Sequence, residues 1–271
     1  MTNHQRFIAL AIGAAVGIVA GLTGVGGGAL VVPLLVSALG LRQHQAHGTS
    51  LAVVTFSAGA SAIPYALAGN FNGLLAAQLM VGTTVGVILG ARWMSRIPAA
   101  QLRRGFGLFL AFTALRLLLP LPAMGILGLL EPGAALLLNM AVGLVVGVIG
   151  GILGVGGGAM IVPAMLLLWG VSQHIAQGIS LVVIVPTGIA GAISHHTRGN
   201  VAWVLVPPLA LGSVAGALFS ASLANNLDTA LLRQSFAAAV IVMSAQMILS
   251  PQGAEAGAER EAAGPFSRDR S

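Results

Sequence analysis

The chain has 271 residues, of which 57% are hydrophobic and 7% are charged. A soluble domain carries about 25% charged residues, so this composition excludes a soluble globular fold. All 12 basic residues are arginine, against six acidic residues, and most of them flank apolar segments, where they mark membrane topology rather than a nucleic-acid site. The sequence contains no cysteine, which excludes disulfides, thiolate metal sites and cysteine nucleophiles.

Long apolar segments run through the chain, including residues 73–91, 106–119 and 179–193. Their lengths are on the scale of the ~20 residues that a helix needs to cross a bilayer. In lipid, the backbone N–H and C=O groups of each segment must be satisfied internally, which favours helices over open sheets. The sequence therefore predicts an all-α polytopic membrane protein.

The first segment, residues 1–20, resembles a secretory signal peptide, because Arg6 precedes an apolar run that ends in small residues. A similar run recurs inside the chain at residues 136–151, so we interpret the first segment as a permanent helix. At the other end, residues 251–271 are rich in Gly, Ala, Glu and Arg, and we expect a disordered cytoplasmic tail there.

The sequence matches itself when it is shifted by 130 residues. Residues 24–29, Gly-Val-Gly-Gly-Gly-Ala, fall on residues 154–159, and Ser50 falls on Ser180. The agreement continues without a gap for about a hundred residues, which indicates an internal duplication. We infer two helical repeats, the first at residues 7–119 and the second at residues 137–250.

Each repeat is predicted to contain five helical pieces, which in the first are residues 7–22, 29–40, 44–68, 73–93 and 100–119. At 1.5 Å per residue, the first two pieces are too short to cross a hydrocarbon core of about 30 Å. The glycine-rich break between them allows a sharp turn. They form either one broken crossing helix or a re-entrant hairpin.

The placement of arginine favours the hairpin. The loop after the fourth piece carries Arg92, Arg96, Arg103 and Arg104, whereas its counterpart, residues 222–228, carries none and is followed only by Arg233. Under the positive-inside rule, this reversal fits a re-entrant hairpin plus three crossings per repeat, an odd number that inverts the second repeat and leaves both termini cytoplasmic. A parallel arrangement with four crossings per repeat is the alternative.

The two glycine-rich turns are the strongest candidate site. Each precedes a helical piece, so backbone N–H groups and the positive end of a helix dipole converge there, as is typical of anion sites. Close helix packing is the alternative role for the glycines, but the repetition of the whole turn favours binding. The candidate substrate-binding glycines are Gly24, Gly26, Gly27, Gly28, Gly154, Gly156, Gly157 and Gly158.

The polar side chains within the predicted membrane segments are mostly hydroxyls. No Asp or Glu lies inside these segments, which disfavours cation coordination and carboxylate proton relays. Thr23, Thr49, Ser50 and Ser180 could donate hydrogen bonds to an anion, and they complete the candidate substrate-binding residues. Packing between helices is the alternative role for any one of these hydroxyls.

The histidines carry a weaker signal. His44 and His174 fall at equivalent places after the second piece, where we expect helix caps at the membrane interface. His47, His195 and His196 are not duplicated, and a lone histidine near a membrane boundary is usually solvated. A proton-coupling role is the alternative.

Four segments together resemble the TauE/SafE sulfite exporter family, also called the toluene-sulfonate uptake permeases. They are residues 21–28 (Gly-Leu-Thr-Gly-Val-Gly-Gly-Gly), 33–35 (Pro-Leu-Leu), 49–51 (Thr-Ser-Leu) and 154–158 (Gly-Val-Gly-Gly-Gly). The resemblance extends from residue 7 to about residue 250, and it implies a multi-pass carrier in the bacterial cytoplasmic membrane for sulfite, thiosulfate, sulfonates or related anions. Ile179 departs from the family pattern, which has Thr before the serine.

The leading interpretation is a secondary transporter that moves a small sulfur-containing anion by alternating access, with that anion and the lipid bilayer as partners. An anion channel is the nearest alternative. A hydrolase has less support, because the sequence lacks a Gly-x-Ser-x-Gly elbow and a nucleophilic serine needs a base within reach; a non-transporting scaffold is a further alternative. We expect no catalytic residue, metal ligand, cofactor or nucleic-acid partner, and the sequence leaves homo-oligomerisation open.

Overall fold

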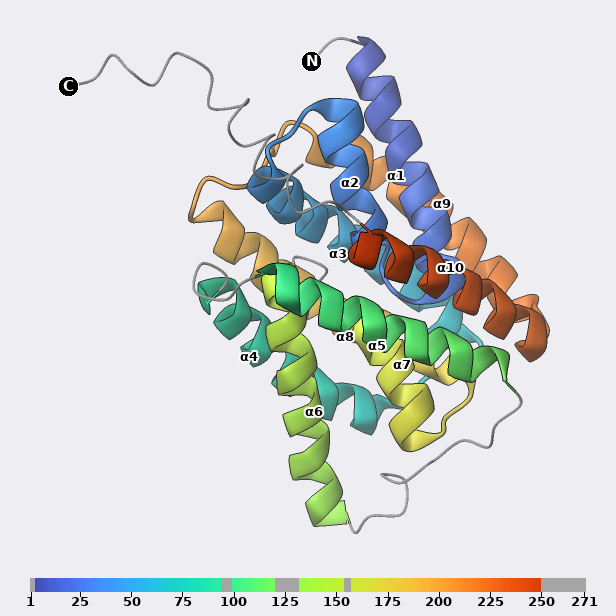
Figure 1. The fold of residues 1–271 in the computed structure, drawn as a ribbon. Coiled ribbons are helices and arrows are strands. Elements are labelled where there is room, and N and C mark those ends of the chain that lie inside the picture. The colour runs from blue at the N-terminus through green and yellow to red at the C-terminus, as the bar shows by residue number, and fades with distance from the viewer. Residues whose placement is uncertain (1–2, 94–98, 120–131, 154–156, 250–271) are drawn as a thin grey trace.

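The computed structural model describes residues 3–93, 99–119, 132–153 and 157–249, which form helices and no strand (Figure 1). The first five helices are α1 (Asn3–Thr23), α2 (Gly28–Leu39), α3 (Gln43–Leu67), α4 (Gly73–Trp93) and α5 (Ala99–Leu118). The next are α6 (Pro132–Leu153), α7 (Gly158–Ala164) with its π-helical continuation η2 (Met165–Trp169), α8 (Gln173–His196), α9 (Val206–Asn226) and α10 (Thr229–Leu249). The expected tail, residues 251–271, lies outside the described residues.

The helix bounds agree with the prediction except at the first piece. Helices α2 to α5 lie within one residue of the predicted ranges. Helix α1 has 21 residues, and its counterpart α6 has 22, so each is about 31 Å or more in length. The prediction that this piece is too short to cross the bilayer is therefore wrong.

Seven of the described helices are long and apolar enough to cross a membrane: α1, α3, α4, α6, α8, α9 and α10. Helix α5, which was predicted to cross, is not among them; it has 20 residues but carries Arg103, Arg104 and Arg116. The chain is an integral multi-pass membrane protein, because this many long apolar helices are stable only in the hydrocarbon core of a bilayer.

The second five helices follow the first five at a spacing of 130 residues. Adding 130 to the bounds of α1, α2, α3 and α5 gives those of α6, α7 with η2, α8 and α10 to within one residue. In Figure 1, α1 runs down from the top of the molecule and α6 runs up from the bottom, so these two helices have opposite directions.

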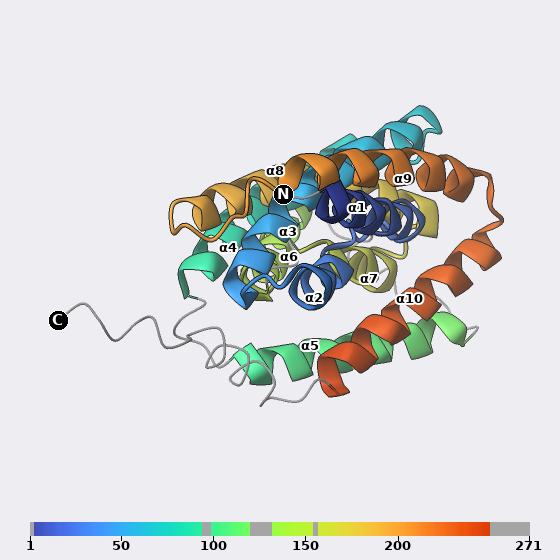
Figure 2. The same ribbon diagram turned by 90° about the horizontal axis from the view of Figure 1, so that it is seen from above.

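Long-range pairing holds the bundle together. Helix α1 packs along α9, α4 along α6, α3 along α8, and α5 along α10. Figure 2 shows α5 and α10 side by side on one flank of the remaining helices. Because α9 also contacts α3 and α4 also contacts α8, the α3–α8 pair lies at the centre of the bundle.

Glycines bring the paired backbones together. A Cβ added at Gly82 or Gly86 of α4 would fall on the carbonyl oxygen of Met140 or Leu144 of α6. In the other pair, a Cβ at Gly17 of α1 would fall on the carbonyl oxygen of Ser213. Small residues at helix interfaces are the usual means of close packing in membranes, so these glycines serve the packing of the helix pairs.

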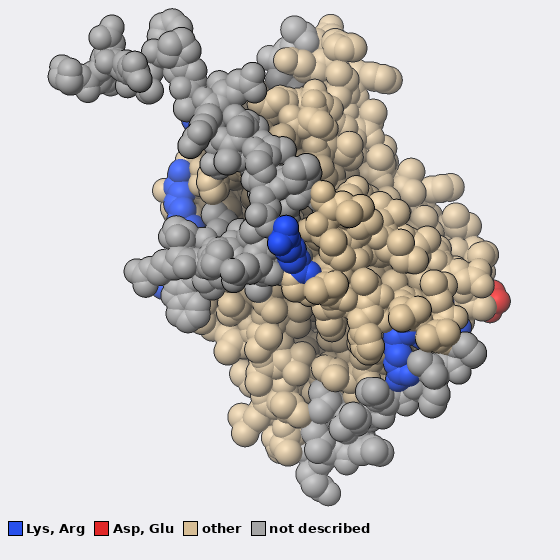
Figure 3. Space-filling model, viewed as in Figure 1, with Lys and Arg blue, Asp and Glu red and all other residues tan. Residues whose placement is uncertain are grey.

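Apolar side chains cover the outer surface as well as the core. On the face shown in Figure 3, the described surface is almost entirely uncharged, with a few separate arginines and one acidic residue at the right edge. Large side chains such as Leu137, Leu211 and Phe219 are exposed on the outer helices. This surface is suited to contact with lipid tails.

Candidate functional site

The first glycine-rich turn reverses the chain between α1 and α2. Gly24, Gly26 and Gly27 have φ angles of +69°, +77° and +78°, which residues with a side chain rarely adopt. The carbonyl oxygen of Gly27 accepts hydrogen bonds from Leu30 N (3.0 Å) and Val31 N (3.2 Å) and so opens α2. The predicted sharp turn is present, and glycine is required for its conformation.

The turn presents buried backbone N–H groups. Gly26, Gly27 and Gly28 are buried, and the described part of the chain offers their N–H groups no hydrogen-bond partner. They lie at the N-terminus of α2, where the helix dipole is positive. A buried unpaired N–H is unfavourable, so these groups are suited to an anionic ligand.

The second turn repeats this geometry where it is described. Gly157 has a φ of +81°, and its carbonyl oxygen accepts from Met160 N (3.0 Å) and Ile161 N (3.2 Å) to open α7. Gly154 and Gly156, which were also predicted to bind substrate, lie outside the described residues.

The two turns adjoin each other beside the central helices. A Cβ added at Gly26 would lie 2.8 Å from Cγ1 of Val54 and 3.2 Å from Cδ1 of Ile184. A Cβ at Gly158 would meet the same Ile184 and would lie 2.7 Å from the carbonyl oxygen of Val25 in the first turn. Val54 and Ile184 are close to the midpoints of α3 and α8, so the turns lie level with the middle of the bundle.

Two of the four predicted hydroxyls lie behind these turns. Ser50 Oγ donates to the carbonyl oxygen of Gly28 at 3.5 Å, and Ser180 Oγ donates to that of Gly158 at 3.4 Å. Both serines are fully buried. These long bonds leave the hydroxyls only weakly engaged, at equivalent places in the two halves.

The other two hydroxyls have different surroundings. Thr23 belongs to the first turn, where its Oγ1 donates to Val19 O at 2.7 Å and accepts from Val25 N at 3.3 Å. Thr49 Oγ1 instead accepts from Ala202 N at 2.9 Å and ties α3 to the segment after α8. The structure thus places Thr49 with a backbone partner outside the turns.

A buried tyrosine and glutamine were missed in the sequence. The hydroxyl of Tyr65 lies 2.6 Å from Oε1 of Gln177 and 3.0 Å from the carbonyl oxygen of Gly21. Gln177 Nε2 donates to Leu22 O at 3.1 Å, and a Cβ added at Gly24 would lie 2.6 Å from Cβ of Gln177. The pair therefore holds the end of α1 and the start of the first turn against α8. The available signal was a single tyrosine and an isolated glutamine in apolar helices.

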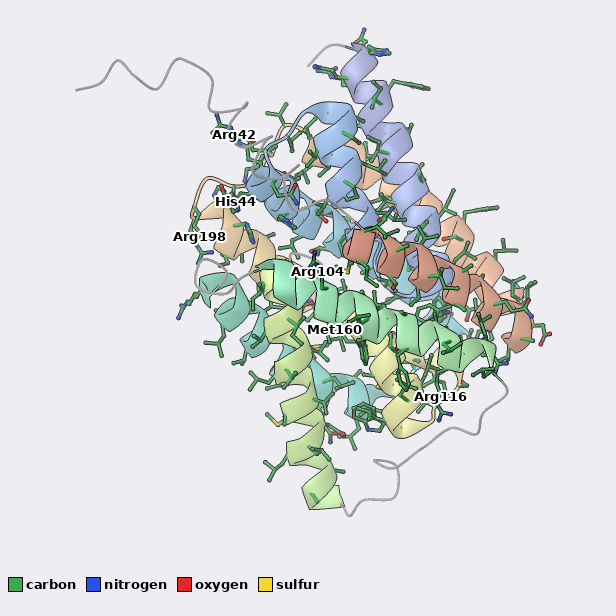
Figure 4. All side chains as sticks on the ribbon, in the orientation of Figure 1. Arg42, His44, Arg104, Arg116, Met160 and Arg198 are labelled. Carbon is green, nitrogen blue, oxygen red and sulfur yellow. The ribbon has the colours of Figure 1, made fainter. Side chains whose placement is uncertain are left out.

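The histidines also depart from the prediction. His195 is fully buried, so the expectation that it is solvated at a membrane boundary is wrong. His174 Nε2 lies 3.3 Å from the carbonyl oxygen of Ala224. His44 lies with Arg42 and Arg198 at one edge of the molecule (Figure 4).

Acidic and metal-binding chemistry is sparse in the described ranges. Asp228, between α9 and α10, is the one acidic residue among them, and no group of three His, Cys, Asp or Glu side chains there could hold a metal ion. What the described site offers is backbone N–H groups and hydroxyls, which suit an anion better than a cation.

Comparisons with known proteins give a family and several relatives. Residues 1–117 and 139–268 match the family described as sulfite exporter TauE/SafE. The probable membrane transporter protein YunE of Bacillus subtilis (strain 168) is 26% identical, over 89% of this chain and 96% of its own length. A probable membrane transporter protein of Xylella fastidiosa (strain Temecula1 / ATCC 700964) is 28% identical, over 92% of this chain and 97% of its own. No solved structure matches the chain.

The family match covers most of the chain, and the relatives above are matched along nearly their whole length. The resemblance expected from the glycine-rich turns and the Thr-Ser-Leu segment is confirmed. The chain belongs to the sulfite exporter TauE/SafE family.

Proposed function

We propose that this protein is a secondary transporter that moves a small sulfur-containing anion, such as sulfite, thiosulfate or an organosulfonate, across the bacterial cytoplasmic membrane by alternating access. One observation carries the proposal: the two glycine-rich turns meet level with the middle of α3 and α8. There, the buried N–H groups of Gly26, Gly27 and Gly28 have no hydrogen-bond partner in the described part of the chain. Broken helices whose N-termini point at an anion near the midplane are a recurrent transporter design.

The two halves support an inverted repeat. Equivalent residues make equivalent bonds, as Ser50 and Ser180 do with the carbonyl oxygens of Gly28 and Gly158. The opposite directions of α1 and α6 also fit two units of opposite orientation (Figure 1). In such a design, one unit moves against the other around a fixed site, which then opens to each side of the membrane in turn.

The chemistry of the site favours an anion of modest size. Backbone N–H groups and hydroxyls bind an oxyanion without the cost of burying a cation. The bacterial relatives and the apolar helices support a location in the cytoplasmic membrane, and the arginines around the end of α4 and the start of α5 favour cytoplasmic termini.

The test is transport by purified protein in proteoliposomes, with radiolabelled sulfite and thiosulfate as substrates. We expect saturable uptake, together with counterflow when unlabelled anion is preloaded. A thermal-shift screen of sulfite, thiosulfate, sulfate, sulfoacetate and taurine on the same preparation would identify the preferred class. Conductance in a planar bilayer without counterflow would instead assign an anion channel.

The site itself is tested by Gly27→Val, which we expect to abolish transport while membrane insertion is retained. A Cβ at Gly27 would lie 2.7 Å from Cγ1 of Val16 and 2.9 Å from its carbonyl oxygen, and φ there is +78°. Gly40→Val is the matched control, because Gly40 has a φ of +65° and no atom within 4 Å of an added Cβ. It imposes the same kind of backbone strain away from the turn. Wild-type anion affinity in Gly27→Val would place the site elsewhere.

A further inference from the structure

The two ends of the central α3–α8 pair have different chemistry. At one end, Tyr65 and Gln177 are hydrogen-bonded at 2.6 Å. The positions 130 residues away from these two are His195 and His47, at the other end of the same pair. The helices cross closely there, because a Cβ added at Gly48 would lie 2.8 Å from Cβ of His195. The hydrogen-bonded Tyr65–Gln177 pair at one end of α3 and α8 therefore corresponds to two histidines at the other end.

The two histidines, His195 buried and His47 half-buried, have too few hydrogen-bond partners. Neither ring nitrogen of His195 has a hydrogen-bond partner in the structure described, although the residue is 0% exposed. Nδ1 of His47 is also buried and unpartnered, while its Nε2 lies 3.3 Å from Nε2 of Gln43. Buried polar groups are almost always paired, so these three nitrogens indicate an unused binding capacity.

The surroundings of this pair are positively charged. His44 lies close enough to act electrostatically on both histidines, and Arg198 acts on His195. Arg42, His44 and Arg198 are exposed at the edge beside the pair (Figure 4), whereas His196 is held by Trp203 Nε1 at 2.8 Å.

The other helices packed on α3 and α8 add no counter-charge. Within the described ranges, α2, α7, η2 and α9 have no titratable side chain. Helix α1 carries His4 and Arg6 near its start, α4 carries Arg92 in its last turn, and α10 carries Arg233. None of these groups could act as the anionic partner of a buried imidazolium.

We infer that His47 and His195 form the proton-binding site that couples transport to the proton gradient, and that the anionic substrate supplies the missing counter-charge. A buried imidazolium without an anion is unfavourable in this apolar bundle, as is a buried anion without a cation. A proton and the anion therefore enter together, and the exposed arginines at the edge attract the anion towards the histidines. The inference rests on the proposed function and names its coupling ion.

Proteoliposomes with a trapped pH-sensitive dye test this coupling, with thiosulfate added outside and the membrane potential clamped. We expect thiosulfate to carry protons in the same direction, and uptake to rise at least tenfold as the pH is lowered from roughly 8 to 6, because the protonated fraction of the histidines increases. Thiosulfate remains a dianion over this range, so the pH dependence reports the protein. If only sulfite exchanges in counterflow, sulfite replaces thiosulfate, and the comparison of wild type with the double variant below carries the test, because sulfite itself takes up a proton near neutral pH.

The sharpest variant, His47→Gln with His195→Tyr, copies the hydrogen-bonded pair of the other end. We expect proton movement and the pH dependence of uptake to be lost, and counterflow to persist at a reduced rate because the anion loses its imidazolium partners. His4→Gln is the control, because it removes an exposed histidine at the start of α1 and should change neither readout.

The outcomes separate the two proposals. Absence of counterflow in the wild type would overturn the proposed transport function, and the coupling inference with it. Counterflow without proton movement in the wild type would overturn the inference alone, whether or not the double variant folds. Proton coupling retained in a folded double variant would also overturn it.

Discussion

Gly27 and Gly157, the last glycines before α2 and α7, adopt the same backbone conformation in different surroundings. Gly27 and Gly157 have φ angles of +78° and +81° and open α2 and α7 with matching hydrogen bonds. A Cβ at Gly27 would lie 2.7 Å from Cγ1 of Val16, whereas a Cβ at Gly157 would lie 3.6 Å from Cγ1 of Val146, the equivalent residue. Gly27 is therefore packed tightly against α1, whereas the space beside Gly157 could accommodate a Cβ atom.

The same glycine-rich sequence therefore hides two separate properties of a turn: its backbone conformation and the space beside it. The left-handed conformation is a local property of glycine and is the same at Gly27 and Gly157. The space beside each turn depends on how α1 and α6 pack, which the local sequence does not encode. Equivalent positions in the two halves should therefore tolerate substitution unequally.

The largest expected difference between the two halves is their orientation in the membrane. Reporters placed after Asn70 and after Asn200 should lie on opposite sides of the membrane, because the opposite directions of α1 and α6 (Figure 1) fit a second repeat that is inverted relative to the first. The measurement is the accessibility of each reporter in intact cells and in inverted vesicles. Both reporters on the same side would restore the parallel arrangement.

Alanine at each turn sharpens the comparison. We expect Gly27→Ala to lower the free energy of unfolding by about 2–5 kcal/mol, from left-handed strain plus overpacking against Val16. Gly157→Ala should lower it by about 1–2 kcal/mol, from strain alone. Denaturant unfolding in one detergent compares the two, and equal losses would show that the space beside the turn does not matter.

A packing glycine should behave differently from a turn glycine. Gly82→Val would drive a side chain into the backbone of Met140 on α6, and we expect it to lower stability by about 1–3 kcal/mol, with transport reduced only in proportion to folded protein. Gly105→Ala is the control on open surface in α5, where we expect a gain of about 0.5–1 kcal/mol. Loss of transport in fully folded Gly82→Val would move this position into the transport mechanism.

The serines behind the turns should have the smallest effect. Ser50→Ala and Ser180→Ala should each weaken anion binding by about 0.5–1.5 kcal/mol, the net value of one hydrogen bond. The two effects should be similar, because the bonds to Gly28 and Gly158 are 3.5 and 3.4 Å long. Calorimetric titration of the purified variants measures them. Unchanged affinity in both variants, with normal folding, would assign the serines to packing.

Much of the fold was determined by the sequence alone. Apolar runs specify helices, since lipid leaves the backbone no other partner, and α2 to α5 begin and end within a residue of the prediction. The start of α1 was missed because its first turn is polar, and that of α6 because Pro132, a favoured first helical residue, was not used as a signal. The glycine-rich turns were predicted because only glycine adopts their conformation readily.

Tertiary structure alone decided which helices pair and which polar groups are buried together. Nothing in the local sequence of Tyr65 or Gln177 indicates their contact, since the two residues lie on different helices. His195 appeared solvated because its position near a helix end was visible and its packing against Gly48 was not. A residue's burial depends on the partner that covers it, and that partner lies far away in the chain.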